Sequence, residues 1–152
     1  MTRTVMNETV FISKGFKIST DKDLLDLEMI YNYLSNESYW SKGITAERVH
    51  TSIENSLSFG IYKNDKQIGF ARVITDKATF AYLCDVFILP GFRKQGLSKW
   101  LLQTILAHPE LQGLRRWLLA TADAHRLYNQ FGFMPLTSPE RWMGIYSPFK
   151  ID

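Results

Sequence analysis

The sequence predicts a single α/β domain of the α+β kind, in which a mixed, mostly antiparallel sheet carries helices on both faces. Three apolar or alternating segments follow one another between residues 57 and 89, which indicates antiparallel strands joined by tight turns. A strand, a helix and another strand then follow between residues 78 and 120, which indicates a right-handed crossover and a parallel pair. With 152 residues and 45% hydrophobic content, the chain can bury one core without disulfides or metals.

The N-terminal region is expected to contain a strand and a helix. Residues 1–15 show no clear period and are predicted to be a loose lead-in, with residues 10–12 as a short strand or edge contact. The alternation of residues 16–19 predicts a strand. Residues 20–23 offer a helix cap with acidic side chains, and the apolar spacing that follows predicts an amphipathic helix over residues 24–34.

A polar loop over residues 36–43 displays two aromatic side chains, Tyr39 and Trp40, that a plain connector does not need. Two interpretations stand equally: these rings pack back on the first helix, or they line a substrate pocket. Thr45 can then cap a second helix that ends near Asn55.

The middle of the chain predicts three antiparallel strands in sequence. Residues 57–62 alternate between apolar and smaller or polar side chains, residues 64–66 make a turn, and residues 67–75 alternate again. A second turn at residues 76–77 leads into a long strand over residues 78–89. The hairpin and the long strand together form the main part of the expected sheet.

The end of that long strand predicts a phosphate-binding turn. An apolar run, Val86–Leu89, is ended by a proline and a glycine, as in a strand covered on both faces. Arg93 and Lys94 follow, Gly96 lets the backbone approach a ligand, and a helix begins directly afterwards. The free N–H groups and the positive dipole end of that helix favour a phosphate.

The C-terminal third predicts two more strands and a short helix. Residues 116–120 form an apolar strand, Asp123 is expected to cap a helix over residues 124–131, and Gly132 is placed to end it in a left-handed conformation. Residues 142–146 are predicted to form the last strand of the sheet, or alternatively an interface strand in a homodimer.

Charge and composition exclude several classes of protein. The 18 Lys and Arg residues against 15 Asp and Glu residues give a net charge of +3, too small to indicate nucleic acid as a partner without a clustered patch. The single cysteine, Cys84, excludes an intrachain disulfide and is expected to be a small buried residue. No apolar run approaches the roughly 20 residues that span a bilayer, and no signal peptide is apparent, so we expect no membrane association and a cytoplasmic protein.

The sequence lacks the residue patterns that other catalytic chemistries need. The three histidines, His50, His108 and His125, are far apart and show no metal-ligand spacing, so no metal is predicted. A phosphate loop ending in Gly-Lys-Ser/Thr, a Gly-x-Ser-x-Gly nucleophile turn and the dinucleotide fingerprint are all absent from the sequence.

The basic turn and a downstream segment resemble one known family. Arg93–Ser98, RKQGLS, is similar to the Arg/Gln-x-x-Gly-x-Gly/Ala signature of the GNAT superfamily of acetyl-CoA-dependent N-acyltransferases. Residues 124–133 resemble the family's Ala-x-x-Leu-Tyr-x-x-x-Gly-Phe helix, and two motifs in the family's order are more specific than one. The sequence departs at Ser98, where Gly or Ala is usual, and at Thr121, where Asn is frequent.

The resemblance implies acetyl-CoA as co-substrate and a sheet that splays where the acyl thioester binds. The backbone groups of Val86 and Ile88 would pair with the pantetheine arm like an added strand. The residues that the resemblance assigns to the cofactor are Val86, Phe87, Ile88, Arg93, Lys94, Gln95, Gly96, Leu97, Ser98 and Thr121. Such enzymes use neither a metal nor a covalent enzyme intermediate.

The same resemblance implies an N-acetyltransferase that acts on a primary amine. We expect the acceptor to be a small molecule, and the resemblance implies that the first two helices shape the acceptor pocket. By family position, Tyr128 donates a proton to the departing thiolate, since a phenol with a pKa near 10 is protonated at neutral pH. Asp85, a carboxylate inside an apolar strand, is the candidate base, with His125 as a lesser candidate proton shuttle. Two alternatives stand: Asp85 is a structural partner of Arg72, Arg126 or backbone groups, and the whole protein is a non-catalytic acyl-CoA sensor.

Overall fold

The computed structural model describes residues 8–150 and contains a five-stranded sheet in the order β1-β2-β3-β4-β5. The strands are β1 (Phe16–Ser19), β2 (Leu57–Lys63), β3 (Lys66–Thr75), β4 (Phe80–Ile88) and β5 (Arg116–Leu118). Neighbours from β1 to β4 are antiparallel, and β4 pairs with β5 in parallel. The predicted mixed, mostly antiparallel sheet is therefore confirmed.

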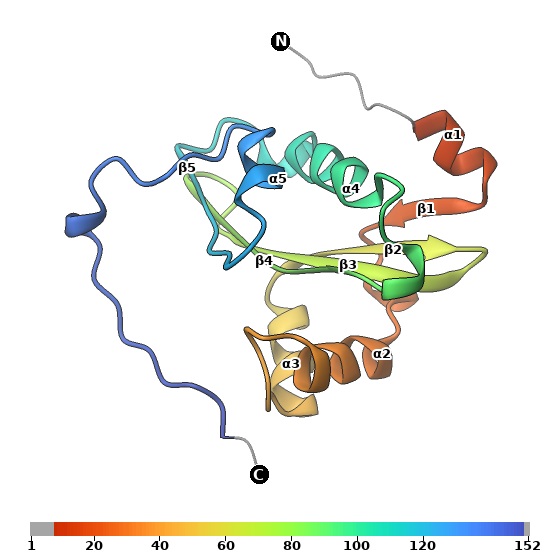
Figure 1. Ribbon diagram of the computed structural model, residues 1–152, viewed down its shortest axis with the longest axis horizontal. Coiled ribbons are helices and arrows are strands. Elements are labelled where there is room, and N and C mark those ends of the chain that lie inside the picture. Colours follow the sequence, from red (N-terminus) through yellow and green to blue (C-terminus); the bar gives the residue numbers. More distant parts are fainter. Residues whose placement is uncertain (1–7, 151–152) are drawn as a thin grey trace.

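Helices cover both faces of the sheet (Figure 1). One face carries α1 (Glu8–Ser13), α4 (Leu97–Leu106) and α5 (His125–Asn129); the other carries α2 (Leu27–Asn32) and α3 (Ala46–Glu54). Two apolar cores result, one centred on α4 and the other on α2 and α3. No helix within residues 8–150 is long and apolar enough to cross a membrane.

The turn before α4 has the conformation that its glycine allows. Gly96 is the N-cap residue of α4 and has φ 89°, a left-handed conformation that costs a non-glycine residue energy. The helix that follows buries Leu97, Trp100 and Leu101 in the first core. The predicted strand, basic turn and helix thus occur in that order.

The first helical region differs from the prediction. Residues 10–12 lie within α1 and form no strand, while residues 1–7 of the expected lead-in lie outside the described residues. Asp21 caps only a short 3-10 turn, Lys22–Leu24, and α2 begins at Leu27 because the Asp26 side chain accepts a hydrogen bond from the Met29 N–H at 3.0 Å. The helix then continues as a π-helical turn over Tyr33–Glu37.

The predicted N-terminal cap is correct for α3 and wrong for α5. Thr45 caps α3 as expected, accepting from the Arg48 N–H at 3.3 Å. Asp123 does not cap α5; the Thr121 hydroxyl instead accepts a hydrogen bond from the Ala124 N–H at 3.1 Å. Residue 121 therefore orders the chain at the start of α5 through its own side chain.

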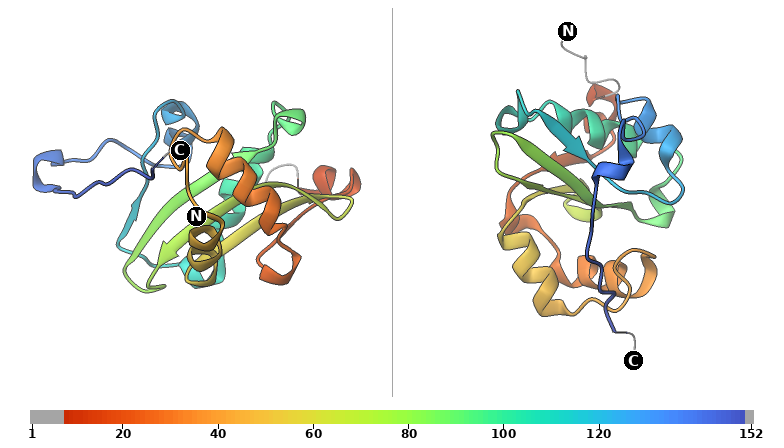
Figure 2. Two further views of the ribbon diagram at one scale, coloured as in Figure 1. Left: turned by 90° about the horizontal axis from the view of Figure 1, so that it is seen from below. Right: turned by 90° about the vertical axis from the view of Figure 1, so that its left-hand side faces the viewer.

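The C-terminal segment also corrects the sequence interpretation. Residues 142–146 form no strand, and within residues 130–150 the only helical or strand element is a short 3-10 turn, η5 (Pro139–Arg141). Figure 2 shows this tail leaving the body beyond β5 and coming down to the layer of α2 and α3. The segment has the residues of a strand, but no strand within residues 8–150 pairs with it.

An irregularity interrupts β4 in the middle of the sheet. Phe70 pairs with Phe87 and Arg72 pairs with Cys84, so two residues along β3 match three along β4. The extra residue produces a β-bulge at which Asp85 has φ 55°, a left-handed conformation rare for a non-glycine residue. A strained, acidic position therefore lies directly before the apolar end of the strand.

Candidate functional site

The candidate site lies where β4 and β5 separate. Their pairing runs from Phe80 with Arg116 to Tyr82 with Leu118 and ends there, whereas β4 continues to Ile88. A cavity of about 640 Å³ opens at this separation, between the remaining residues of β4 and the segment of residues 119–124. The predicted splay of the sheet is therefore present.

The cavity collects most of the residues predicted for the site. Eight of them line it: Asp85, Val86, Phe87, Ile88, Arg93, Ser98, Thr121 and Tyr128. The other four, Lys94, Gln95, Gly96 and Leu97, belong to the turn and the first residue of α4 and do not line it. Leu97 is only 2% exposed and packs in the core, so only its backbone can serve a ligand.

Arg93 is held in place by two hydrogen bonds. Its Nε donates to the Ile88 carbonyl at 2.8 Å, and its Nη2 donates to the Tyr33 hydroxyl at 3.0 Å. The Tyr33 ring stacks on Phe87 with ring centroids 3.9 Å apart. The guanidinium therefore ties the turn to β4 and to the opposite helical layer, and Tyr33 is a site residue that the sequence did not single out.

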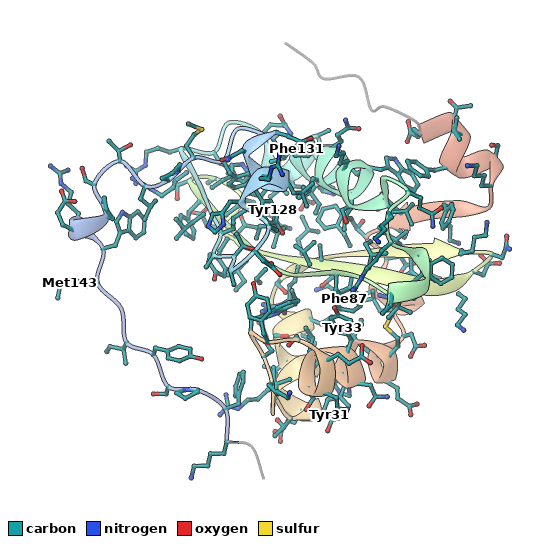
Figure 3. The ribbon with its side chains drawn as sticks, viewed as in Figure 1. Tyr31, Tyr33, Phe87, Tyr128, Phe131 and Met143 are labelled. Carbon is teal, nitrogen blue, oxygen red and sulfur yellow. The ribbon has the colours of Figure 1, made fainter. Side chains whose placement is uncertain are left out.

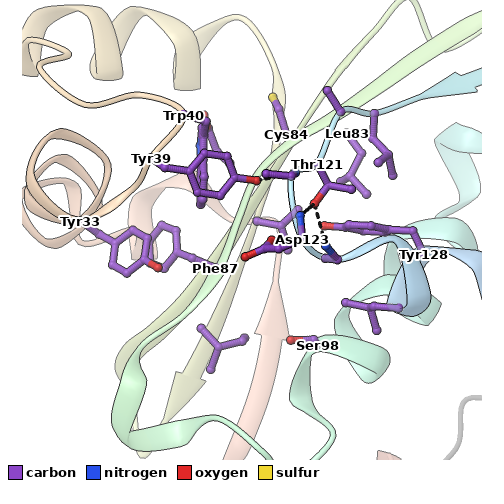
Figure 4. A pocket seen from close by; sticks show the side chains of 18 of the residues that line it. Tyr33, Tyr39, Trp40, Leu83, Cys84, Phe87, Ser98, Thr121, Asp123 and Tyr128 are labelled. Atoms are coloured by element: carbon purple, nitrogen blue, oxygen red, sulfur yellow. Dashed lines mark hydrogen bonds between the residues drawn. The ribbon is translucent and has the colours of Figure 1, made fainter.

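The rest of the turn is shaped by its backbone. Lys94 and Gly96 both have positive φ, 66° and 89°, and the Gln95 side chain donates to the Phe92 carbonyl at 2.9 Å. Backbone N–H groups of a turn that contains left-handed residues can point toward one concave side, which suits an anion. The side chain of Ser98, one residue into α4, faces the cavity in Figure 4.

Asp85 is buried and paired on both oxygens. Its side chain is 6% exposed, its Oδ2 lies 2.9 Å from the Nε of Arg72, and its Oδ1 accepts a hydrogen bond from the Trp40 Nε1 at 2.9 Å. The predicted alternative of a pair with Arg72 is thus observed; Arg126 forms no ion pair within residues 8–150. Charge pairing and two hydrogen bonds satisfy a carboxylate that burial alone would penalise.

Tyr128 lies across the cavity from that pair. It is 9% exposed, and its hydroxyl forms no hydrogen bond within the described part of the chain. Burial, with smaller effects from Tyr39 and Asp123, raises the pKa of Tyr128 to about 12. The phenol therefore keeps its proton at neutral pH and has a free O–H group at the cavity wall.

Both aromatic residues of the loop after α2 line the cavity, and Trp40 also packs back on the helical layer. Trp40 lies against Tyr33, with ring centroids 6.4 Å apart, and also lines the cavity. The Tyr39 hydroxyl accepts a hydrogen bond from the Ala122 N–H at 2.9 Å, which joins this loop to the segment after β5. Figure 4 shows Tyr39 and Trp40 on one side of the opening and Tyr128 on the other.

Two further polar residues contribute to the site without a clear sequence signal. Arg72 lies on β3, and only the register of β3 against β4 places it beside Asp85. Glu37, at the end of the π-helical turn, is exposed and lines the same cavity. His125 lies instead along a second cavity behind α5 and does not line the first.

A metal centre has no support in the described residues. Within residues 8–150, no group of three or more His, Cys, Asp or Glu side chains could hold a metal ion. The chemistry available at the cavity is that of a protonated phenol, a paired carboxylate and free backbone groups.

Comparison with known proteins gives consistent results. The sequence model of the acetyltransferase (GNAT) family matches residues 27–133. A candidate acetyltransferase from Gibberella zeae is 32% identical over 109 residues, which is 59% of this chain and 62% of that protein. The chain thus matches less than two thirds of the length of this fungal relative.

Solved structures share the fold. A candidate acetyltransferase of the GNAT family from Xanthomonas campestris pv. campestris has a TM-score of 0.86 and 49% identity, covering 88% of this chain and 94% of its own. A protein from Clostridium acetobutylicum, predicted to be an acetyltransferase and solved with acetyl-CoA, has a TM-score of 0.64 at 14% identity. The match covers 86% of this chain and 94% of that chain. The second likeness concerns the fold alone.

Proposed function

This chain belongs to the GNAT family of acetyltransferases, and from that premise we propose that it transfers an acetyl group from acetyl-CoA to a primary amine of a small molecule. The acceptor nitrogen attacks the thioester directly, without a covalent enzyme intermediate. The observation that carries the proposal is the free, protonated hydroxyl of Tyr128 at the cavity where β4 and β5 separate.

The co-substrate would bind along the separated strands. Beyond Tyr82, β4 has no strand partner on its β5 side within residues 8–150, so we assign to the backbone at Val86 and Ile88 the pairing with the amide groups of a pantetheine arm. The backbone of the turn and the N-terminus of α4 supply N–H groups for the pyrophosphate, with Lys94 beside them. Arg93 would act chiefly by holding the turn against β4.

The proton inventory of the reaction assigns a role to Tyr128. A protonated amine must lose two protons to become an amide, the thiolate leaving group gains one, and one passes to water. Thiolate departure is easier when a donor stands beside the sulfur, and a phenol whose pKa is about 12 remains protonated until it is needed. We therefore assign to Tyr128 the donation of that proton, which is replaced by the second proton that the nitrogen loses.

Asp85 supplies negative charge on the opposite side. Arg72 and Trp40 occupy one lone pair on each carboxylate oxygen, which leaves further lone pairs for the acceptor ammonium. In this proposal Asp85 attracts and orients the acceptor and accepts its first proton. Glu37 adds a second carboxylate at the rim, which also favours a cationic amine.

The direct test is the substitution Tyr128→Phe, which removes the hydroxyl and keeps the ring. With a panel of primary amines and detection of released CoA, we expect kcat to fall about 100-fold, in the range for loss of a general acid. Titration calorimetry should give the variant the wild-type affinity for CoA within about twofold, because no binding contact with the cofactor is assigned to this hydroxyl.

Tyr31→Phe is the matched control, because this tyrosine packs against the α2 and α3 core and does not line the cavity. It should leave kcat unchanged. Equal rates for Tyr128→Phe and wild type would contradict the assigned role of Tyr128. Acetyl-CoA binding without turnover of any amine would instead favour the sensor interpretation.

A further inference from the structure

The candidate site continues into a further cavity on the side of α2. This α2 cavity, of about 370 Å³, lies along α2 and the π-helical turn that follows it. Tyr33 and Glu37 line both the α2 cavity and the cavity between β4 and β5, so the two cavities meet at these residues. An acceptor whose reacting nitrogen lies near Asp85 can therefore extend past Glu37 into the α2 cavity.

The α2 cavity is acidic. Three carboxylates line it, those of Asp26, Glu28 and Glu37, and within residues 8–150 no Lys, Arg or His side chain does so. The whole chain has a net charge of +3, so the charge of this cavity is opposite to the average of the protein. Walls of one sign attract ligands of the other sign. The α2 cavity therefore favours an acceptor that is positively charged at its far end and disfavours one that carries a carboxylate or phosphate there.

Glu37 has no counter-charge at the junction of the two cavities. Its carboxylate forms no ion pair or hydrogen bond within the described part of the chain. Asp85, by contrast, is already paired with Arg72. Arg93, the one basic residue along the first cavity, is engaged by two hydrogen bonds on the side of the turn. The charge of Glu37 is therefore available to a cation of the ligand.

Aromatic rings lie beside this carboxylate. Tyr33 stacks on Phe87, and Figure 3 shows the two side chains next to each other between the sheet and α2. The Trp40 ring lies 6.4 Å from that of Tyr33 and lines the same cavity as Glu37. Ring faces attract an ammonium group and pack against methylene groups. Aromatic walls next to a carboxylate thus suit an alkylammonium chain.

The opening of the first cavity limits the acceptor to a slender molecule. The Tyr39 hydroxyl accepts a hydrogen bond from the Ala122 N–H at 2.9 Å and so joins the loop after α2 to the segment after β5. A bulky acceptor, such as a lysine on the surface of a folded protein, would need this hydrogen bond to break. An unbranched small molecule can pass along the cavity without breaking it.

We propose that the acceptor is a linear aliphatic diamine or polyamine, with one terminal amine at Asp85 for reaction and the next ammonium group bound by Glu37 beside the Tyr33 ring. The inference rests on the proposed function, because it names the acceptor of the same site. An aliphatic amine has a pKa close to that of lysine, about 10.4, so such a molecule carries two positive charges at neutral pH. The reacting end loses its protons during transfer, whereas the second ammonium group keeps its charge and serves only in binding.

The experiment compares two amines with the same number of carbon atoms. Butylamine has one amine group, and diaminobutane has one at each end of the chain. Titration calorimetry on the full chain saturated with CoA measures both affinities without turnover, since no acetyl group is present. We expect the wild type to bind diaminobutane at least about tenfold more tightly than butylamine. Glu37→Gln, which keeps the size and removes the charge, should reduce this preference about fivefold.

Glu47→Gln is the matched control, because Glu47 is an exposed glutamate on α3 that lines neither cavity. It makes the same change of charge and should keep the preference. Equal affinities of the wild type for the two amines would overturn the inference, and so would a preference that Glu37→Gln leaves intact. Tighter binding of a short lysine-containing peptide than of diaminobutane would overturn it as well, in favour of a protein acceptor.

Turnover with acetyl-CoA separates this inference from the proposed reaction. Release of CoA with both amines at equal kcat/KM would support the reaction and overturn the inference about the acceptor. A preference for diaminobutane that depends on Glu37, without release of CoA from either amine, would support the binding site at Glu37 and count against the proposed reaction.

Discussion

The helix α4 and the tail segment Trp142–Tyr146 are both rich in large apolar residues, yet they have opposite surroundings. In α4, Leu97, Trp100 and Leu101 are at most 3% exposed and lie in the first core. In the tail, Ile145 is fully exposed. The difference shows that apolar residues fix an element only when its partner surface lies in the same chain, and that the tail's surface is to be sought elsewhere.

The largest expected effect separates these two regions by stability. Leu101→Ala should lower the free energy of unfolding by about 2–5 kcal/mol, because it leaves a cavity in the core. Met143→Ala should change it by less than about 0.5 kcal/mol, because the 97% exposed side chain contacts little in the protomer. Urea denaturation followed by tryptophan fluorescence, at a concentration below that of self-association, measures both.

The comparison fails if the two variants lose similar stability under those conditions. In that case the tail would be packed within the protomer, and the exposure of Met143 would not describe the chain in solution. A large loss for Met143→Ala only at higher protein concentration would instead sharpen the comparison, since the stability of an interface depends on concentration.

An intermediate effect is expected at the turn before α4, where backbone conformation matters more than packing. Gly96→Ala should cost about 1–2 kcal/mol, because φ 89° is left-handed, while the added Cβ would meet only the Phe11 Cζ at an ordinary 3.6 Å. Gly91→Ala, in open space and without positive φ, should change stability by less than about 0.5 kcal/mol. Thermal unfolding of the two variants tests this, and equal losses would mean that the turn is free to adopt another conformation.

The smallest effect concerns pH and tests whether the middle of β4 is closed to solvent. Burial raises the pKa of the Cys84 thiol on β4 from 9.0 to about 12. Because the unfolded thiol ionises first, the stability from this group is complete below pH 9 and is lost as the pH rises toward 12. Between pH 8 and pH 10 the wild type should lose about 1 kcal/mol more than Cys84→Ala.

Denaturant midpoints for both proteins at the two pH values give this difference directly. An identical pH dependence would show that the thiol is accessible in the folded state, and that this part of β4 opens to solvent. The rise in the pKa of Tyr128 has the same sign, but it acts only above pH 10, the ordinary pKa of a phenol.

The sequence predicts the elements that depend on neighbours along the chain. The alternation of β2 and β3, the strand and turn before α4, and the parallel pairing of β5 all rest on local patterns and short connections. The Thr45 cap is of the same kind. Eight of the predicted site residues line one cavity, and three of them, Arg93, Ser98 and Tyr128, belong to the two motifs.

What the sequence could not predict depends on register and on distant residues. Arg72 meets Asp85 only because of the pairing of β3 with β4, and Tyr33 reaches Arg93 across 60 positions of sequence. The start of α2 was misplaced because Asp21 and Asp26 both have capping side chains, and the later one begins the α-helix. The tail was predicted as a strand because its residues favour one, although pairing needs a partner edge.

The bulge at Asp85 sets the phase of β4. Before it, odd-numbered residues such as Ala81 and Leu83 point into the α4 core; after it, Phe87 points into the α2 and α3 core and Ile88 takes the α4 side. Because of the one extra residue, odd-numbered residues face α4 before the bulge and even-numbered residues face it after the bulge. A regular strand of the same length, without the bulge, would turn Phe87 and Ile88 to the wrong layers, so the bulge decides which core each of these residues joins.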